Sequence, residues 1–107
     1  MVAQPACPDD LVDYLRLALR LSGHAFDEEV AGLADAAVAD MLRAGVSEAY
    51  VSEFGPLVRR AVALYCKAGF GYDNADAALF DRSYRQCVTD MLNGPANEAA
   101  SAQGDAS

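Results

Sequence analysis

Side chains with catalytic or metal-binding chemistry are few in this sequence, and they do not cluster. The one histidine, His24, lies in a stretch expected to be a turn, so a Ser/His/Asp or Cys/His centre would depend on a single residue outside any helix. The cysteines Cys7, Cys66 and Cys87 show no CxxC spacing, whereas zinc sites need clustered thiolates or imidazoles. We therefore expect no enzyme, no metal site and no cofactor site, and interpret the cysteines as reduced, mostly buried apolar residues.

Other motifs for binding or catalysis are also weak. The second predicted helix carries four acids: Glu28, Glu29, Asp35 and Asp40. They do not form the repeated carboxylate pairs with which an all-helical hydrolase holds magnesium, and there is no Glu-x-x-His pair for a di-iron site. The Gly69-Phe70-Gly71 segment has no GK[ST] after it and predicts the end of a helix rather than a phosphate-binding loop. These features favour a solvated acidic face.

The net charge of −8 is unevenly distributed along the chain. Residues 1–53 hold ten acids against Arg16, Arg20 and Arg43, a net charge of −7, whereas residues 54–93 sum to +1 and the remainder to −2. An acidic half and a mildly basic half favour head-to-tail contact between copies of one subunit, although solubility alone is an alternative explanation. No predicted helix gathers the Arg and Lys side chains that a DNA-reading helix needs, but an acidic wall would let DNA slide past without sticking.

The composition fits one compact domain. With 107 residues, 53% of them hydrophobic, the chain can bury a modest core. The first ten residues have neither a basic nor an apolar signal region, so we expect an intracellular protein. We predict a helical domain over residues 1–93 and a flexible tail over 94–107, which is small and polar and expected to be disordered. The tail is either a spent terminus or an arm that orders on a partner.

Apolar residues at helical spacing predict an all-α fold, a small antiparallel bundle of four main helices. The first starts at Cys7-Pro8 and stops at Ser22-Gly23. Residue Asp27 is expected to cap the second, and Gly45 ends it. The third starts at Gly55-Pro56 and the fourth spans 75–92, with Asp73 or Asn74 as its cap. The Val46 to Phe54 connection has room for one short helical turn between the second and third helices.

The third helix is predicted to be the centre of the bundle. Its middle, residues 61–66, carries no charge on any side, which is typical of a helix buried all round, and it is too short for the roughly 20 residues that span a bilayer. The apolar faces of the first and last helices include Tyr14 and Leu79. The predicted core consists of Leu15, Leu33, Val38, Leu57, Ala61, Leu64, Tyr65, Phe80 and Tyr84.

Two arginines stand at the start of the central helix, where the helix dipole is positive. Arg59 and Arg60 are therefore unfavourably placed unless an acidic group faces them. That group would come from the same chain or from a neighbouring copy; the alternative is two solvated arginines.

The order of these features resembles a known family. The segments DYLRLALRLSG, AFDEEVAGLADAAVADMLRAGV, PLVRRAVALYCKAGFGYDNAD and LFDRSYRQCVTDML together resemble the gp6-like head-tail connector proteins of tailed phages, over about residues 9–93. The resemblance implies a non-enzymatic virion protein, assembled in the host cytoplasm, at the head-tail interface of a phage or prophage particle. Its copies would form a homo-oligomer, a dodecameric ring under the portal protein, that extends the channel for passing DNA without reading its sequence. A stopper or tail-completion protein would sit below, and no membrane is involved.

For such a ring we hypothesise a subunit interface between basic and acidic residues: Arg59, Arg60, Arg82 and Arg85 against Glu28, Glu29 and Asp35. The connection between the second and third helices, with Glu48, Tyr50 and Glu53, is the hypothesised contact with another ring. The alternative from another class is a small helical regulatory protein that binds a host or phage protein through an exposed apolar face. A small enzyme would require a bound metal or cofactor.

Overall fold

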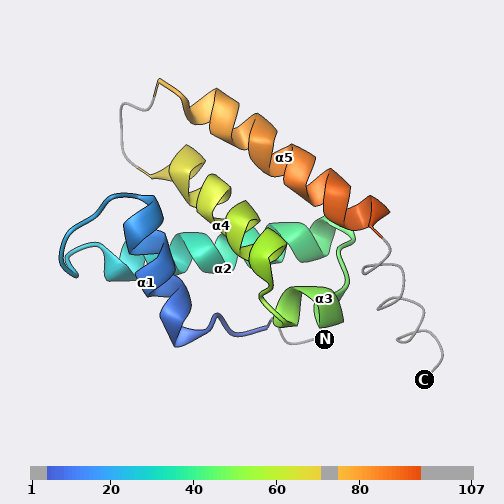
Figure 1. Ribbon diagram of the computed structural model, residues 1–107, viewed down its shortest axis with the longest axis horizontal. Helices are drawn as coiled ribbons and strands as arrows, with labels where there is room; N and C mark the ends of the chain where they lie inside the picture. Colours follow the sequence, from blue (N-terminus) through green and yellow to red (C-terminus); the bar gives the residue numbers. More distant parts are fainter. Residues whose placement is uncertain (1–4, 71–74, 95–107) are drawn as a thin grey trace.

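The computed structural model describes residues 5–70 and 75–94. Within these ranges it contains no strand. Its helices are α1 (Asp9–Ala18), α2 (Asp27–Ala44), α3 (Glu48–Ser52), α4 (Pro56–Gly69) and α5 (Ala77–Asn93) (Figure 1). The all-α prediction is confirmed, and α3 is the short turn expected between the second and third main helices. None of the helices in the described ranges is long and apolar enough to cross a membrane.

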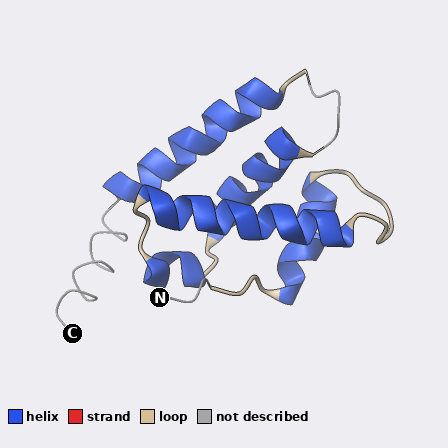
Figure 2. Ribbon diagram, turned by 180° about the vertical axis from the view of Figure 1, so that it is seen from behind, coloured by secondary structure: helices blue, strands red, loops and turns tan. Residues whose placement is uncertain are grey.

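Helix α4 lies at the centre of the fold, as its uncharged middle predicted. It packs against α5 on one side and against α2 and α1 on the other, and α2 crosses in front of it in Figure 2. Residues Ala61, Val62 and Cys66 of α4 have no exposed surface. A charge at any of these positions would lie in the apolar interior, where an unpaired charge is costly.

The predicted core is found in the interior or against it. Five of its members are buried: Leu15, Val38, Ala61, Leu64 and Tyr84. The other four are partly buried and pack against the core: Leu33, Leu57, Tyr65 and Phe80. The rings of Tyr65 and Tyr84 meet edge to face at 5.2 Å between centroids, which is a favourable aromatic geometry. These contacts join α4 to α5.

Two residues assigned to apolar faces are exposed instead. Tyr14 is 39% exposed and Leu79 is 54% exposed. Leu79 precedes the buried Tyr84 by five residues, which turns it by about 140° around α5, away from α4. Their hydrophobicity assigned both residues to apolar helix faces, but only one side of each helix is covered by neighbours.

Two helix ends share one backbone motif with different residues. Helix α1 ends at Ala18, earlier than the predicted Ser22-Gly23 stop, and Arg20 takes the left-handed conformation at φ 59°. The amide of Leu21 then donates to the Arg16 carbonyl at 2.9 Å, satisfying a carbonyl at the helix end. Helix α2 ends as predicted at Gly45, with φ 110°. Glycine adopts this conformation without steric cost, whereas arginine does not.

The predicted helix starts are partly confirmed. Gly55 precedes Pro56, the first residue of α4, as expected. Asp27 is the first residue of α2 but not its cap, because its carboxylate contacts other side chains and no side chain caps this helix. Helix α5 starts at Ala77, later than the expected 75. The proposed caps Asp73 and Asn74, together with most of the predicted tail, lie outside the described residues.

The connection between α2 and α4, which contains α3, is held in place by hydrogen bonds and buried side chains, although long connections in small domains are often mobile. We call this connection the corner. The Ser47 hydroxyl caps α3 by accepting from the Tyr50 amide at 3.0 Å. Val51 and Phe54 are buried, and Phe54 takes the left-handed conformation at φ 47°, which is unusual for a bulky residue. Its carbonyl accepts a hydrogen bond from Arg59 Nε at 2.8 Å.

Candidate functional site

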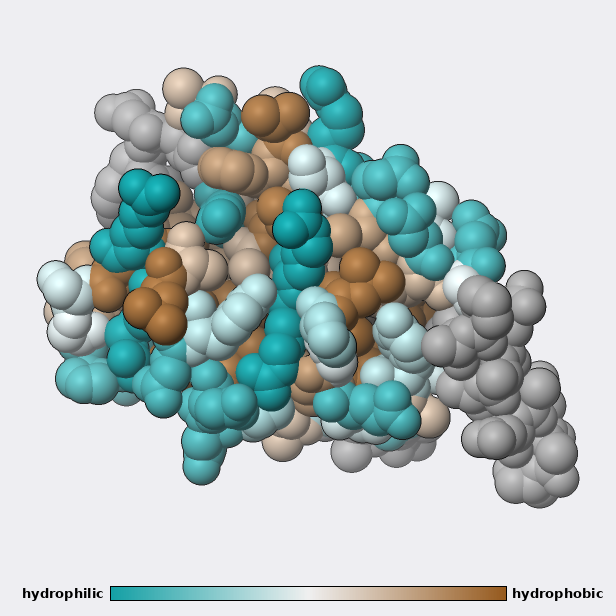
Figure 3. All heavy atoms as spheres, in the orientation of Figure 1, coloured by the Kyte–Doolittle hydropathy of each residue, from teal (hydrophilic) through white to brown (hydrophobic). Residues whose placement is uncertain are grey.

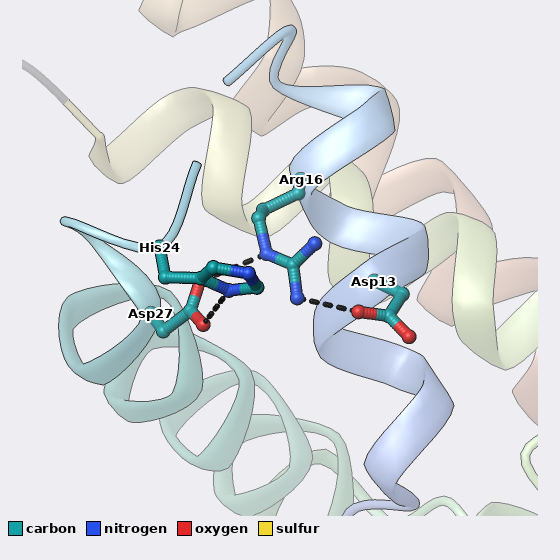
Figure 4. A network of polar contacts seen from close by, with 4 residues as sticks. All are labelled: Asp13, Arg16, His24 and Asp27. Carbon is teal, nitrogen blue, oxygen red and sulfur yellow. Dashed lines mark hydrogen bonds and ion pairs between the residues drawn. The ribbon is translucent and has the colours of Figure 1, made fainter. Parts of the chain in front are cut away.

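A polar network fastens α1 to the start of α2 (Figure 4). Arg16 Nε donates to Asp27 at 2.9 Å while its Nη2 contacts Asp13, and His24 Nδ1 lies 2.9 Å from the other Asp27 oxygen. The hydrogen bond with His24, and then that from Arg16, hold the pKa of Asp27 below its ordinary value despite some desolvation. The histidine thus lies in the connection between α1 and α2, and the contact that joins the two helices is the one between Arg16 and Asp27.

A second network joins α2 to α5 beside a hollow. The Tyr84 hydroxyl donates to Asp40 at 2.6 Å, and Arg43 pairs with the same carboxylate. Burial raises the pKa of Asp40, but the Tyr84 hydrogen bond and Arg43 outweigh it, so the pKa lies below the ordinary value. Burial and the carboxylate both raise the pKa of Tyr84. Arg85, which pairs with Asp81 at 2.8 Å, lines the same hollow.

The cysteines are free thiols in apolar surroundings. Cys66 and Cys87 are buried, and Cys7 is half-buried with its thiol 3.4 Å from an Asp35 oxygen. Burial raises the pKa of the Cys66 thiol to about 12; burial and then Asp35 raise that of Cys7 to about 11. Both thiols therefore stay protonated near neutral pH, which disfavours nucleophilic chemistry. Among the described residues, no three His, Cys, Asp or Glu side chains come together as metal ligands.

The structure gives Arg59 an acidic partner within its own chain. Its Nη1 lies 3.2 Å from Asp10 of α1, and its Nε binds the Phe54 carbonyl. The need for an acidic neighbour at this helix start is thus met inside the fold. Arg60 is exposed and makes no ion pair with a described residue. Of the two arginines, Arg60 is the one left for an external partner.

The remaining hypothesised interface residues lie on two sides of α4. Arg82 and Arg85 are exposed on α5, whereas Glu28, Glu29 and Asp35 are exposed on α2. Helix α4 separates α5 from α1, while the C-terminal half of α2 reaches α5 through Asp40 (Figure 1). The structure does not bring the basic set and the acidic set together within one chain.

The hypothesised partner-contact residues lie on or next to α3. Glu48 and Glu53 are exposed, and Tyr50 is half-buried against the core. Because Val51 and Phe54 hold the segment from beneath, the two carboxylates are presented on a fixed surface.

Sequence reasoning missed three features of the structure. Asp40 was interpreted as a solvated acid and Asp10 was given no partner, yet they bind Tyr84 and Arg59 from distant parts of the chain. Leu17, left off the apolar stripe of the first helix, is 80% exposed. In Figure 3 the most hydrophobic side chains on this face stand as separate groups, among them one over α1, one at the start of α5 and one near the middle of the view. The sequence did contain a signal for the exposure of Leu17, because this leucine falls on the polar side of an amphipathic helix.

Comparison with known proteins identifies the family. A model of phage connector proteins matches residues 13–94, from within α1 to the end of α5. The chain belongs to the phage connector protein family. No curated protein and no solved structure matches it. The resemblance found in the sequence is thereby confirmed, and with it a structural role of the connector type. In this connector, the two polar networks link α1 to α2 and α2 to α5.

Proposed function

We propose that this connector is the head-tail adaptor of a tailed phage or prophage particle. Its copies form a ring, of twelve subunits, beneath the portal protein, extend the DNA channel and link the capsid to the tail. The observation that carries the proposal is the match to the connector family across nearly all of the helical domain. The particle is assembled in the host cytoplasm, and the adaptor then resides in the virion.

The charge distribution supports a ring. Exposed acids on α2 and exposed arginines on α5 lie on different sides of α4. Opposite charges attract across a head-to-tail contact, in which each subunit uses one surface for each neighbour. Such a contact closes into a ring when the rotation per subunit allows it. The contact pairs Arg60, Arg82 and Arg85 with Glu28, Glu29 and Asp35; Arg59 already has its partner Asp10.

The acidic balance also suits a channel for DNA. With a net charge of −8, the surface repels phosphates, so the polymer passes without sequence recognition or tight binding. The fixed carboxylates Glu48 and Glu53, with Tyr50, serve as the contact with the portal or with a stopper protein below. Residues 94–107 provide a second contact with the portal.

Electron microscopy of the purified chain, alone and mixed with portal, tests the proposal directly. Rings alone, or rings that form only on the portal or at high concentration, support the adaptor. A stable one-to-one complex with a host protein, without rings under either condition, would instead point to the regulatory protein considered above.

The charge component has its own test. The double variant Arg82→Glu/Arg85→Glu is expected to abolish ring formation at low salt. The matched control Arg20→Glu, compared with Arg82→Glu alone, makes the same change in net charge at an exposed arginine outside the proposed contact and should still assemble. If the first pair assembles normally at several salt concentrations, the arginines of α5 are not part of the interface.

A further inference from the structure

We propose that Leu79 and Arg82 of one copy dock into a groove on the next copy, between its N-terminal segment, α1 and α2. The inference rests on the proposed ring and names the contact that builds it. We call Leu79 and Arg82 the α5 ridge and the hollow at Pro5–Asp9, α1 and α2 the N-terminal groove.

The N-terminal groove has an apolar floor and an acidic edge. It encloses about 750 Å³ and is lined by small apolar residues that include Val12, Ala31 and Ala34. The exposed carboxylates of Asp9 and Asp35 stand at its edge, and Asp35 also accepts from the Cys7 thiol at 3.4 Å. Such a surface fits an apolar side chain that has a cation beside it.

The α5 ridge offers that combination. Leu79 is 54% exposed, and Arg82 is exposed without an ion-pair partner among the described residues. Because they are three residues apart in a helix, they are neighbours on one face. That face points away from α4, since the buried residues Tyr84, Cys87 and Val88 lie on the other side of the helix.

Ridge and groove cannot meet within one molecule. In Figure 1 the start of α5 lies along one edge of the fold and the N-terminal segment along the opposite edge. A contact between them therefore joins two copies. In a head-to-tail contact, the copy that supplies the ridge keeps its groove and the copy that supplies the groove keeps its ridge for a further neighbour.

Charge distinguishes this groove from two other hollows of the described residues. The hollow between α2 and α5 is lined by Arg43 and Arg85, and the one beside Phe70 is lined by Arg20 and Lys67. The cations of both would repel an incoming Arg82, and the one carboxylate in the first hollow, Asp40, already binds Tyr84 and Arg43. Asp9 and Asp35, in contrast, attract it.

Zero-length crosslinking tests the pairing without removing the charge. The chain has one lysine, Lys67, so Arg82→Lys adds a single amine that a carbodiimide couples only to a carboxylate in direct contact. In rings formed on the portal, we expect a ladder of dimers, trimers and larger products on a denaturing gel, with the new link mapped by mass spectrometry to Asp35 or Asp9. The matched control Arg20→Lys should give no ladder.

Links to other carboxylates, or none, would overturn the inference while portal-bound rings continued to support the proposed function. If the unaltered chain formed no rings, the proposed function itself would be wrong. A product that stops at the dimer would show a symmetric contact and also overturn the inference.

A second comparison measures the apolar part of the contact. Leu79→Ser is expected to raise the concentration needed for ring formation by at least tenfold, because it removes the side chain that fills the groove. Leu17→Ser removes an equally large and more exposed leucine from α1 and should change that concentration less than twofold. Equal effects of the two changes would contradict the ridge.

Discussion

Helices α1 and α5 flank the same central helix but are held in different ways. Helix α5 buries Tyr84, Cys87, Val88 and Met91 along its second half. Helix α1 buries only Leu11 and Leu15, and ion pairs fasten its two ends, Arg59 to Asp10 and Arg16 to Asp27. Burial of apolar area is insensitive to salt and pH, whereas exposed ion pairs contribute little and are screened. The α1 edge should therefore be the weaker and the more condition-dependent one.

The largest expected effect is on the apolar anchor of α1. Leu15→Ala should destabilise the fold by about 2 to 4 kcal/mol, because the fully buried side chain leaves a cavity. Hydrogen exchange should show loss of protection in α1 before α5. The control Leu17→Ala, at an exposed position of the same helix, should change the free energy of unfolding by less than about 0.5 kcal/mol. Simultaneous loss of protection in both helices would remove the contrast between them.

The next effect concerns the hydrogen bond between Tyr84 of α5 and Asp40 of α2. Tyr84→Phe should cost about 1 to 2 kcal/mol in urea unfolding, since Asp40 loses its phenol donor in a partly buried site. In the parent, the lowered pKa of Asp40 means that its contribution is present above the ordinary carboxyl pKa and is lost as pH falls through the folded value. In the Tyr84→Phe variant, the free energy of unfolding should therefore decrease less as the pH is lowered. Tyr65→Phe, which keeps the edge-to-face packing, should be nearly neutral.

A smaller effect of opposite sign is expected where α1 ends. Arg20→Gly should stabilise the fold by about 0.5 to 1 kcal/mol, because glycine adopts the left-handed conformation without steric cost but is more flexible when unfolded. Gly45→Ala makes the reverse change at the matching end of α2 and should destabilise by about 1 kcal/mol. Thermal unfolding of both variants checks the pair. The same sign in both would show that the left-handed positions are not equivalent.

The smallest effect concerns the ion pairs of α1. Because the pKa of Asp27 is lowered in the folded state, its contribution is present above the ordinary carboxyl pKa and disappears as pH falls through the folded value. Hydrogen exchange between pH 6 and about pH 3 should therefore show opening at the α1–α2 junction before α5, and added salt should produce the same trend. Asp27→Asn should abolish this pH dependence at the junction. If the variant opens with acid as the parent does, another carboxylate is responsible.

Local sequence signals predicted the helices well, but not the pairing of their polar side chains. Gly45 and the Gly55-Pro56 start were readable because backbone preferences act over a few residues. The partners Asp10 of Arg59 and Asp40 of Tyr84 lie 49 and 44 residues away, so nothing in the local pattern points to them. Asp27 was interpreted as a cap because its type suits one, yet Arg16 of another helix competes for the carboxylate.

The exposed apolar residues show a second limit of the sequence. Tyr14 and Leu79 fit an apolar stripe by type, but the width of the covered stripe depends on how many helices pack against it. In a small bundle the flanking helices α1 and α5 each meet their neighbours on one side. The interface residues proposed for the ring remain predictions, because a single chain does not show what meets its outer surface.

The anchored corner at α3 has a mechanical consequence. Phe54 is buried in a left-handed backbone conformation, and its carbonyl accepts a hydrogen bond from Arg59. Both features hold the connection between α2 and α4 in one conformation. A force applied to Glu48 or Glu53 would pass straight into the helices instead of being absorbed by a yielding loop. A force on α3 would thus rotate the whole subunit as one rigid body.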